Sequence, residues 1–209
     1  MFTMTWENIC VFGDSITWGA HRLPSRLSWT NLLRNELENE GREYRVYDLG
    51  IDMNTTKDLI RRFAAEASAR DPHIIIINIG VNDSLYRKTI DYPETDLRTF
   101  KENMTAIIAM ARTFTDKVML VGLVKGDDKL TMPLAQSTTG KIYTKSRVRE
   151  YDRIIKDLAE TSDVVFADVN DKLDDSDFSD GLHPNEIGYK KMYKEIRQAF
   201  DVLVNKIRS

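Results

Sequence analysis

Apolar and polar positions alternate in blocks along the chain. Short apolar runs, several rich in Val and Ile, are each bounded by Gly, Asp, Asn or Pro, which is typical of strands. The predicted strands cover residues 9–12, 44–49, 73–79, 118–124 and 164–169. Because these runs are almost continuously apolar, we expect a sheet that is buried on both faces.

Longer segments with apolar residues at helical spacing lie between these runs. Ser28 can cap a helix that reaches about residue 40, and Thr55 or Thr56 can cap the next one. Further helices are predicted at about 94–113, at about 145–160 and from Pro184, which suits a first turn, to about 207. Strands that alternate with helices predict an α/β fold with a parallel sheet between helix layers.

Composition narrows the class of protein. A length of 209 residues is most simply one domain over residues 1–209, and a net charge of −3 gives no reason to expect nucleic acid as a partner. No run approaches the ~20 apolar residues of a membrane span. The single cysteine, Cys10, and a start without a basic and apolar leader favour a cytoplasmic location.

Polar residues follow four of the five strands. They are Gly13-Asp14-Ser15, the turn from Gly50 to Thr55, Gly80-Val81-Asn82-Asp83, and Asp180-Gly181-Leu182-His183 a little after the last strand. Ligands of open parallel sheets bind outside the carboxyl ends of the strands, so we expect these segments to meet at one edge.

The residue types at that edge are those of an acyl-transfer site. Ser15 can act as a nucleophile once the imidazole of His183 takes its proton, and Asp180 can hold that ring in the correct tautomer. The backbone N–H groups of Ser15 and Met53 and the side-chain amide of Asn82 are the predicted oxyanion donors.

Three further residues are candidates for substrate contact. Asp14 is expected mainly to organise the turn, Trp18 either lines the pocket mouth or packs, and Asp52 borders the site. His21 could approach the pocket, and Asp83 is expected to fix the loop that carries Asn82.

These segments together resemble the SGNH hydrolases, also called the GDSL esterase/lipase family. Three of the family's four signature blocks are present, at residues 13–15, 80–83 and 180–184. The resemblance implies a three-layer α/β/α fold similar to flavodoxin, with five parallel strands in the order 2-1-3-4-5. It also implies ester hydrolysis without a metal or cofactor, with Ser15 as nucleophile, His183 as base and Asp180 as its orienter.

The remaining block departs from the family pattern. Family members usually carry a glycine whose N–H enters the oxyanion hole, and the matching position here is Met53. A backbone donor survives this change, but Met would be strained if the turn required a positive φ. Met53 could also narrow the acyl pocket.

The sequence therefore predicts a serine esterase or deacylase that acts on a small or medium acyl ester, with acetyl esters among the candidate substrates. The polar segments 125–144 and 84–96 are expected to form the rim of its pocket, although segment 125–144 could also be a simple surface insertion.

Other functions remain open. One is an inactive protein of the same fold that binds an acyl or sugar ligand. Another is a flavodoxin-like binding module, which is disfavoured because acidic Asp14 stands where a phosphate-binding loop would begin. An α/β-hydrolase fits less well, because no serine after a strand lies in Gly-x-Ser-x-Gly.

Overall fold

The predicted strands form one parallel sheet in the order β2-β1-β3-β5-β7. In the computed structural model, which describes residues 6–20, 24, 27–41, 43–91 and 93–205, the strands are β1 (Glu7–Gly13), β2 (Tyr44–Gly50), β3 (Ile74–Asn78), β5 (Val118–Val121) and β7 (Val165–Ala167). Counting only these strands gives the order 2-1-3-4-5, so the predicted fold class is confirmed.

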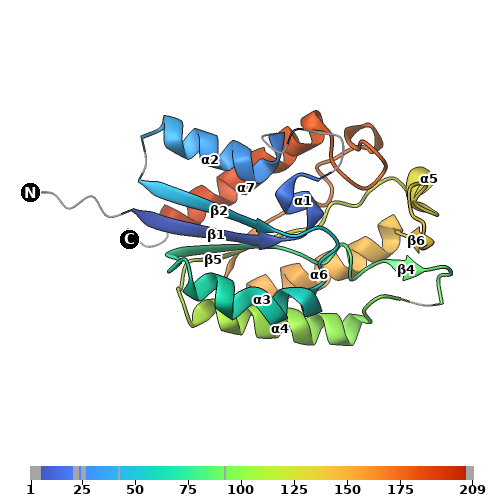
Figure 1. Ribbon diagram of the computed structural model, residues 1–209, viewed down its shortest axis with the longest axis horizontal. Coiled ribbons are helices and arrows are strands. Elements are labelled where there is room, and N and C mark those ends of the chain that lie inside the picture. The colour runs from blue at the N-terminus through green and yellow to red at the C-terminus, as the bar shows by residue number, and fades with distance from the viewer. Residues whose placement is uncertain (1–5, 21–23, 25–26, 42, 92, 206–209) are drawn as a thin grey trace, which may run out of the picture.

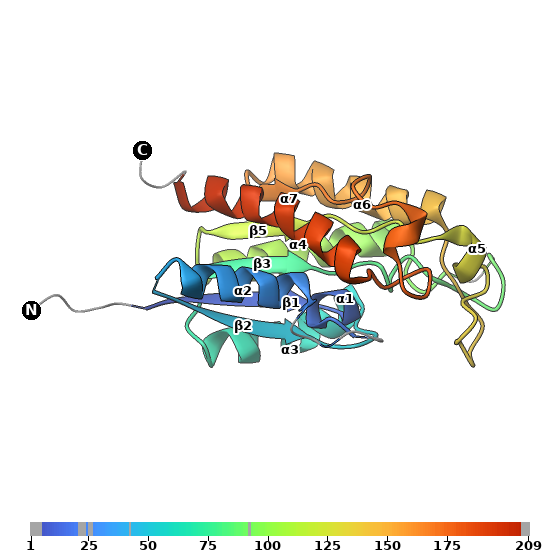
Figure 2. The ribbon, with the colours of Figure 1, turned by 90° about the horizontal axis from the view of Figure 1, so that it is seen from above.

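Helices cover both faces of this sheet (Figures 1 and 2). Helices α2 (Trp29–Asn39) and α7 (Glu186–Asn205) lie on one face, and α3 (Thr56–Ser68), α4 (Leu97–Arg112) and α6 (Lys145–Thr161) lie on the other. Ser28 and Thr55 are N-caps, as expected. None of the helices in the described ranges combines the length and apolarity that crossing a bilayer requires.

Two helices begin later than the sequence pattern suggested. Helix α4 begins at Leu97, because the Asp96 side chain accepts the backbone N–H of Thr99 and caps the helix there. The expectation that Pro184 occupies the first turn of the last helix is wrong. Helix α7 begins at Glu186, and the Asn185 side chain accepts N–H groups of its first turn. The predicted end at residue 207 lies outside the described residues.

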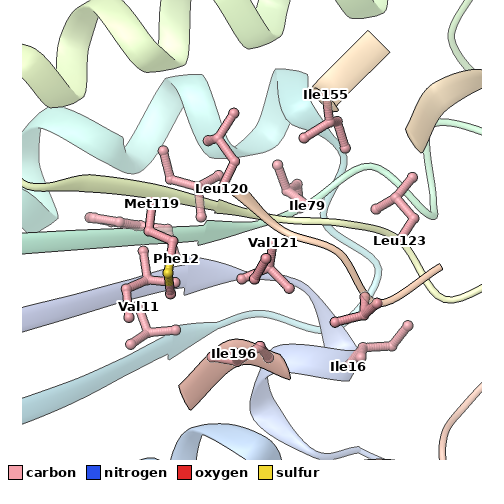
Figure 3. Packing of buried hydrophobic residues seen from close by; sticks show 14 of the residues in the cluster. Val11, Phe12, Ile16, Ile79, Met119, Leu120, Val121, Leu123, Ile155 and Ile196 are labelled. Carbon is pink, nitrogen blue, oxygen red and sulfur yellow. The ribbon is translucent and has the colours of Figure 1, made fainter. Parts of the chain in front are cut away.

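The core lies between the sheet and its two helix layers. Successive residues of β5 point to opposite faces, with Leu120 toward Ile155 of α6 and Val121 toward Ile196 of α7 (Figure 3). This two-sided burial is why the strands are continuously apolar. Cys10 of β1 is fully buried, and that burial raises the pKa of its thiol to about 12.

Short elements at the carboxyl edge were not predicted. They are α1 (Ser15–Trp18), β4 (Tyr86–Arg87), α5 (Asp128–Thr131), β6 (Lys141–Ile142) and a 3₁₀ turn, η2 (Asp175–Asp177). Strands β4 and β6 pair antiparallel. Segment 125–144 is therefore tied to the body of the protein, and the backbone N–H of Asp127 also donates to Gly181 O at 2.6 Å.

Candidate active site

The turn after β1 presents the hydroxyl of Ser15. Asp14 caps helix α1 by accepting the backbone N–H of Ile16 at 3.0 Å, so the chain turns sharply at Ser15. Gly13 permits the turn because a Cβ atom there would lie 1.9 Å from Thr17 Oγ1 and 2.5 Å from Asn78 O. Ser15 is thus held at the end of a buried strand.

Ser15, His183 and Asp180 form a chain of hydrogen bonds. Ser15 Oγ lies 3.1 Å from His183 Nε2, and His183 Nδ1 lies 2.9 Å from Asp180 Oδ2. Asp180 Oδ1 also accepts the backbone N–H of His183 at 2.9 Å. The carboxylate therefore fixes both the ring and the backbone of the histidine, and the ring in turn reaches the hydroxyl of Ser15.

Asp180 keeps its negative charge in this environment. Burial by itself disfavours the charged carboxylate, but the hydrogen bond and the charge of His183 outweigh burial and hold the pKa of Asp180 well below its usual range. A permanently ionised carboxylate can stabilise an imidazolium that forms beside it.

Two other carboxyls hold the turns in place. Asp83 accepts the backbone N–H of Thr56 at 2.9 Å and its hydroxyl at 2.6 Å, which ties the loop of Asn82 to helix α3. Asp14 is 2% exposed, and burial raises its pKa to about 7. Both residues organise backbone, as the sequence suggested.

The turn after β2 requires a positive φ at Met53, which is the condition under which strain is expected there. Met53 has φ 63°, which is left-handed backbone that favours glycine. Arg62 supports this turn, because its Nε donates to Asn54 Oδ1 at 2.8 Å and its guanidinium also donates to Gly13 O at 2.9 Å. Sequence reasoning missed Arg62, since a single arginine on a helix carries no motif.

Asn82 connects this turn to segment 125–144. Its Nδ2 donates to Asn54 O at 3.1 Å, and its Oδ1 accepts the hydroxyl of Tyr143 at 3.0 Å. Tyr143 was not singled out from the sequence, because nothing near it along the chain marks it as part of a site.

A pocket of about 110 Å³ opens at these residues. Its lining includes the predicted residues Ser15, Asp52, Met53, Asn82, Asp180 and His183. Segment 125–144 contributes Leu134, Gln136, Ser137, Lys141 and Tyr143, so this segment forms a wall of the pocket.

Not every predicted contact lies in that pocket. Asp14 is buried beneath the turn, and Trp18 is 48% exposed outside the pocket lining, so their contacts with substrate stay predictions. Segment 84–96 supports the wall through β4 and does not line the pocket itself. His21 lies outside the described residues.

This arrangement of hydroxyl, imidazole and carboxylate at the edge of an α/β/α sheet is the one that serine hydrolases use. Residues 11–191 match the model of the GDSL-like lipase/acylhydrolase family. The chain therefore belongs to this family.

Sequence similarity to a curated protein is consistent with membership of this family. The chain is 28% identical over 117 residues to esterase TesA of Pseudomonas aeruginosa, an alignment that covers 56% of this chain and 54% of TesA. The chain thus spans about half the length of this curated relative.

Solved structures share the fold over nearly their whole length. The lipase/acylhydrolase from Enterococcus faecalis superposes with a TM-score of 0.75 at 22% identity, covering 95% of this chain and 96% of that one. Axe2, an acetylxylan esterase from Geobacillus stearothermophilus, gives a TM-score of 0.73 at 19% identity, covering 92% and 93%.

Proposed function

We propose that this protein is a serine esterase or deacylase that hydrolyses a small acyl ester, with an acetyl ester as the favoured substrate. The observation that carries the proposal is the distance of 3.1 Å between Ser15 Oγ and His183 Nε2, with Asp180 on the far side of the ring. This is hydrogen-bond reach for proton transfer to a general base.

In the first half of the reaction, His183 Nε2 takes the proton of Ser15 as Oγ bonds to the ester carbonyl carbon. The carbonyl π electrons move to oxygen and form a tetrahedral oxyanion. When that intermediate collapses, the bond to the alcohol oxygen breaks and His183 returns the proton to the leaving alcohol. The acyl group is then esterified to Ser15.

Water completes the cycle by the same route. His183 removes a proton from water as the water oxygen attacks the acyl carbon, and it then protonates Ser15 Oγ as the acid leaves. Asp180, which is fixed by Leu182 and His183 backbone N–H groups, holds the ring for both halves.

The oxyanion is assigned to three donors: the backbone N–H groups of Ser15 and Met53 and the amide of Asn82. Met53 and Asn82 lie on turns that Asn54 joins, since Asn54 O accepts from Asn82 Nδ2 at 3.1 Å. Losing one such donor typically lowers turnover by about 10²–10³.

The small size of the pocket supports a short acyl group, and the polar side chains in its wall support a polar substrate. The pocket volume of about 110 Å³ is below the roughly 300–1,000 Å³ of sites for drug-sized ligands. Gln136, Ser137 and Lys141 place polar side chains in its wall, and Axe2, which shares the fold, is an acetylxylan esterase. An acetylated polar molecule, such as an acetylated sugar, fits these features.

We also propose that residues 1–209 act as a single hydrolase domain. The last helix, α7, packs against α2 and against β5 and β7. The C-terminal part of the described chain therefore packs on the same sheet that contains β1 from its N-terminal part. The cytoplasmic location stays a prediction.

The test compares the wild type with Ser15→Ala on p-nitrophenyl acetate. We expect the substitution to lower kcat by at least about 10⁴-fold without loss of folding, because the nucleophile is gone. A phosphonofluoridate should add its mass to Ser15 in the wild type and not in the variant.

Two outcomes would contradict the proposal. Undiminished turnover in Ser15→Ala would remove Ser15 as nucleophile, and a folded wild type without turnover or labelling would favour the inactive ligand-binding alternative. A tenfold preference for the decanoyl over the acetyl ester would overturn the choice of substrate only.

A further inference from the structure

Tyr143 lies directly after β6 and brings its hydroxyl to Asn82. The side chain is 2% exposed, and its hydroxyl donates to Asn82 Oδ1 at 3.0 Å. The orientation of the Asn82 amide is unambiguous, because Nδ2 faces Asn54 O, a carbonyl that can only accept. The atom that faces Tyr143 is therefore the amide oxygen.

The backbone holds Tyr143 in this place. Its N–H donates to Thr131 O at 3.0 Å, and its carbonyl accepts the Thr131 hydroxyl at 2.8 Å. The neighbouring Lys141 reaches the other predicted oxyanion turn, with Nζ 2.8 Å from Met53 Sδ. Segment 125–144 thus contacts both oxyanion residues that lie outside the serine turn.

The hydroxyl of Tyr143 remains a donor across the working pH range. Burial, and then the charge of Asp14, raise the pKa of Tyr143 well above its ordinary value, so the phenol stays protonated. The Asn82 amide has two N–H groups. One is occupied by Asn54 O, which leaves the other for a ligand in the pocket that Asn82 lines.

We infer that Tyr143 is a positioning residue for the oxyanion hole: its O–H fixes and polarises the Asn82 amide, so that the amide's second N–H stabilises the oxyanion. This inference rests on the proposed function. Accepting a hydrogen bond at the amide oxygen makes the amide N–H groups stronger donors. The terminal torsion of an asparagine is otherwise broad, and without Tyr143 only the contact of Nδ2 with Asn54 O would hold the amide.

The effect should fall on the chemical step. An interaction that is stronger in the transition state than in the ground state changes kcat and leaves KM nearly unchanged. A tyrosine that only fills space would instead be replaced by phenylalanine with little effect on kcat, because the ring is retained.

The experiment measures kcat and KM of Tyr143→Phe on p-nitrophenyl acetate. We expect kcat to fall ~10-fold, less than the loss of a whole donor, with KM within about twofold. Tyr151→Phe is the matched control, since Tyr151 is also fully buried and its hydroxyl bonds to Arg147 and Thr95 away from the pocket. That variant should keep kcat within about twofold.

A double-mutant cycle with Asn82→Ala separates positioning from general damage. We expect Asn82→Ala to lower kcat by about 10²-fold and Tyr143→Phe to add nothing in that background. The inference is overturned if Tyr143→Phe leaves the wild-type kcat unchanged, or if it lowers kcat equally in both backgrounds.

The same measurements distinguish a failure of this inference from a failure of the proposed function. If Asn82→Ala is impaired and Tyr143→Phe is not, only the role of Tyr143 fails. If Asn82→Ala retains full kcat, Asn82 is not an oxyanion donor, and the inference falls with that part of the proposed function.

Discussion

At the scale of single residues, Met53 shows how the site tolerates a departure from the family pattern. Its φ of 63° costs a residue with a Cβ about 1–2 kcal/mol relative to right-handed backbone. The turn persists because Asn54 is held on two sides, by Arg62 at its side chain and by Asn82 at its carbonyl. The strain is thus balanced by contacts from α3 and from the loop after β3.

Comparing Met53→Gly with Met53→Ala isolates that strain. Both changes remove the same contacts of the Met side chain with Lys141 and the pocket, but only glycine relieves the left-handed backbone. We expect Met53→Gly to be the more stable of the two by about 1 kcal/mol in urea unfolding. Equal stability would mean that the turn carries no strain.

At the scale of elements, helix α5 packs on the turn that carries the catalytic histidine candidate. Gly181 lies in this turn with φ +91°, and a Cβ atom there would lie 2.5 Å from Leu130 Cβ. Its carbonyl accepts the N–H of Asp127, which caps α5. The Asp180–His183 turn and segment 125–144 are therefore built against each other.

Gly181→Ala should disturb both the Asp180–His183 turn and segment 125–144. The added methyl must push α5 away or distort the turn, so we expect a loss of about 2–3 kcal/mol in unfolding free energy together with reduced kcat. Gly41→Ala is the control, because Gly41 has a similar φ of +67° with nothing within 4 Å of the added Cβ. It should lose only about 1–2 kcal/mol and keep its kcat. Equal losses in the two variants would show that α5 does not press on the turn.

At the scale of the whole molecule, the fold buries several carboxyls. Burial raises the pKa of Asp14 to about 7 and that of Asp48, Asp83 and Asp152 to about 6. Each binds its proton more tightly in the folded state than in the unfolded chain. Each therefore contributes stability at low pH that is lost as the pH rises through its folded pKa. Asp180 acts in the opposite sense, since its lowered pKa contributes stability that is lost only as the pH falls below the usual carboxyl range.

Asp14→Asn should reduce the loss of stability that occurs as the pH rises. For a pKa raised from 3.8 to about 7, linkage predicts that Asp14 accounts for about 2–3 kcal/mol of the stability lost between pH 5 and pH 8. The variant keeps an oxygen that can cap Ile16. We expect its unfolding free energy, measured by urea unfolding at pH 5 and at pH 8, to fall by about 2–3 kcal/mol less than that of the wild type. Asp91→Asn, at an exposed carboxyl, should follow the wild type. A parallel loss in wild type and Asp14→Asn would contradict the raised pKa.

The resemblance to the family implied the strand order. The pattern along the chain was enough to predict the parallel sheet and the meeting of Ser15 with His183, although 168 residues separate them. The physical reason is that each step is local or follows a general rule of topology. Apolar runs mark buried strands, family motifs mark the strand ends, and parallel strands bring their carboxyl ends to one edge. The first turn of α7 was missed because a side-chain cap at Asn185, not the proline, sets where the helix begins.

Only the tertiary structure decided what surrounds those motifs. The hydroxyl of Tyr143 reaches Asn82 across 61 residues, and Arg62 reaches Gly13 across 49, through side chains that no local pattern relates. The φ of Met53 and the size of the pocket likewise depend on how segment 125–144 and α3 pack at the edge. Such contacts depend on the positions of atoms from distant segments, and a pattern along the chain does not contain those positions.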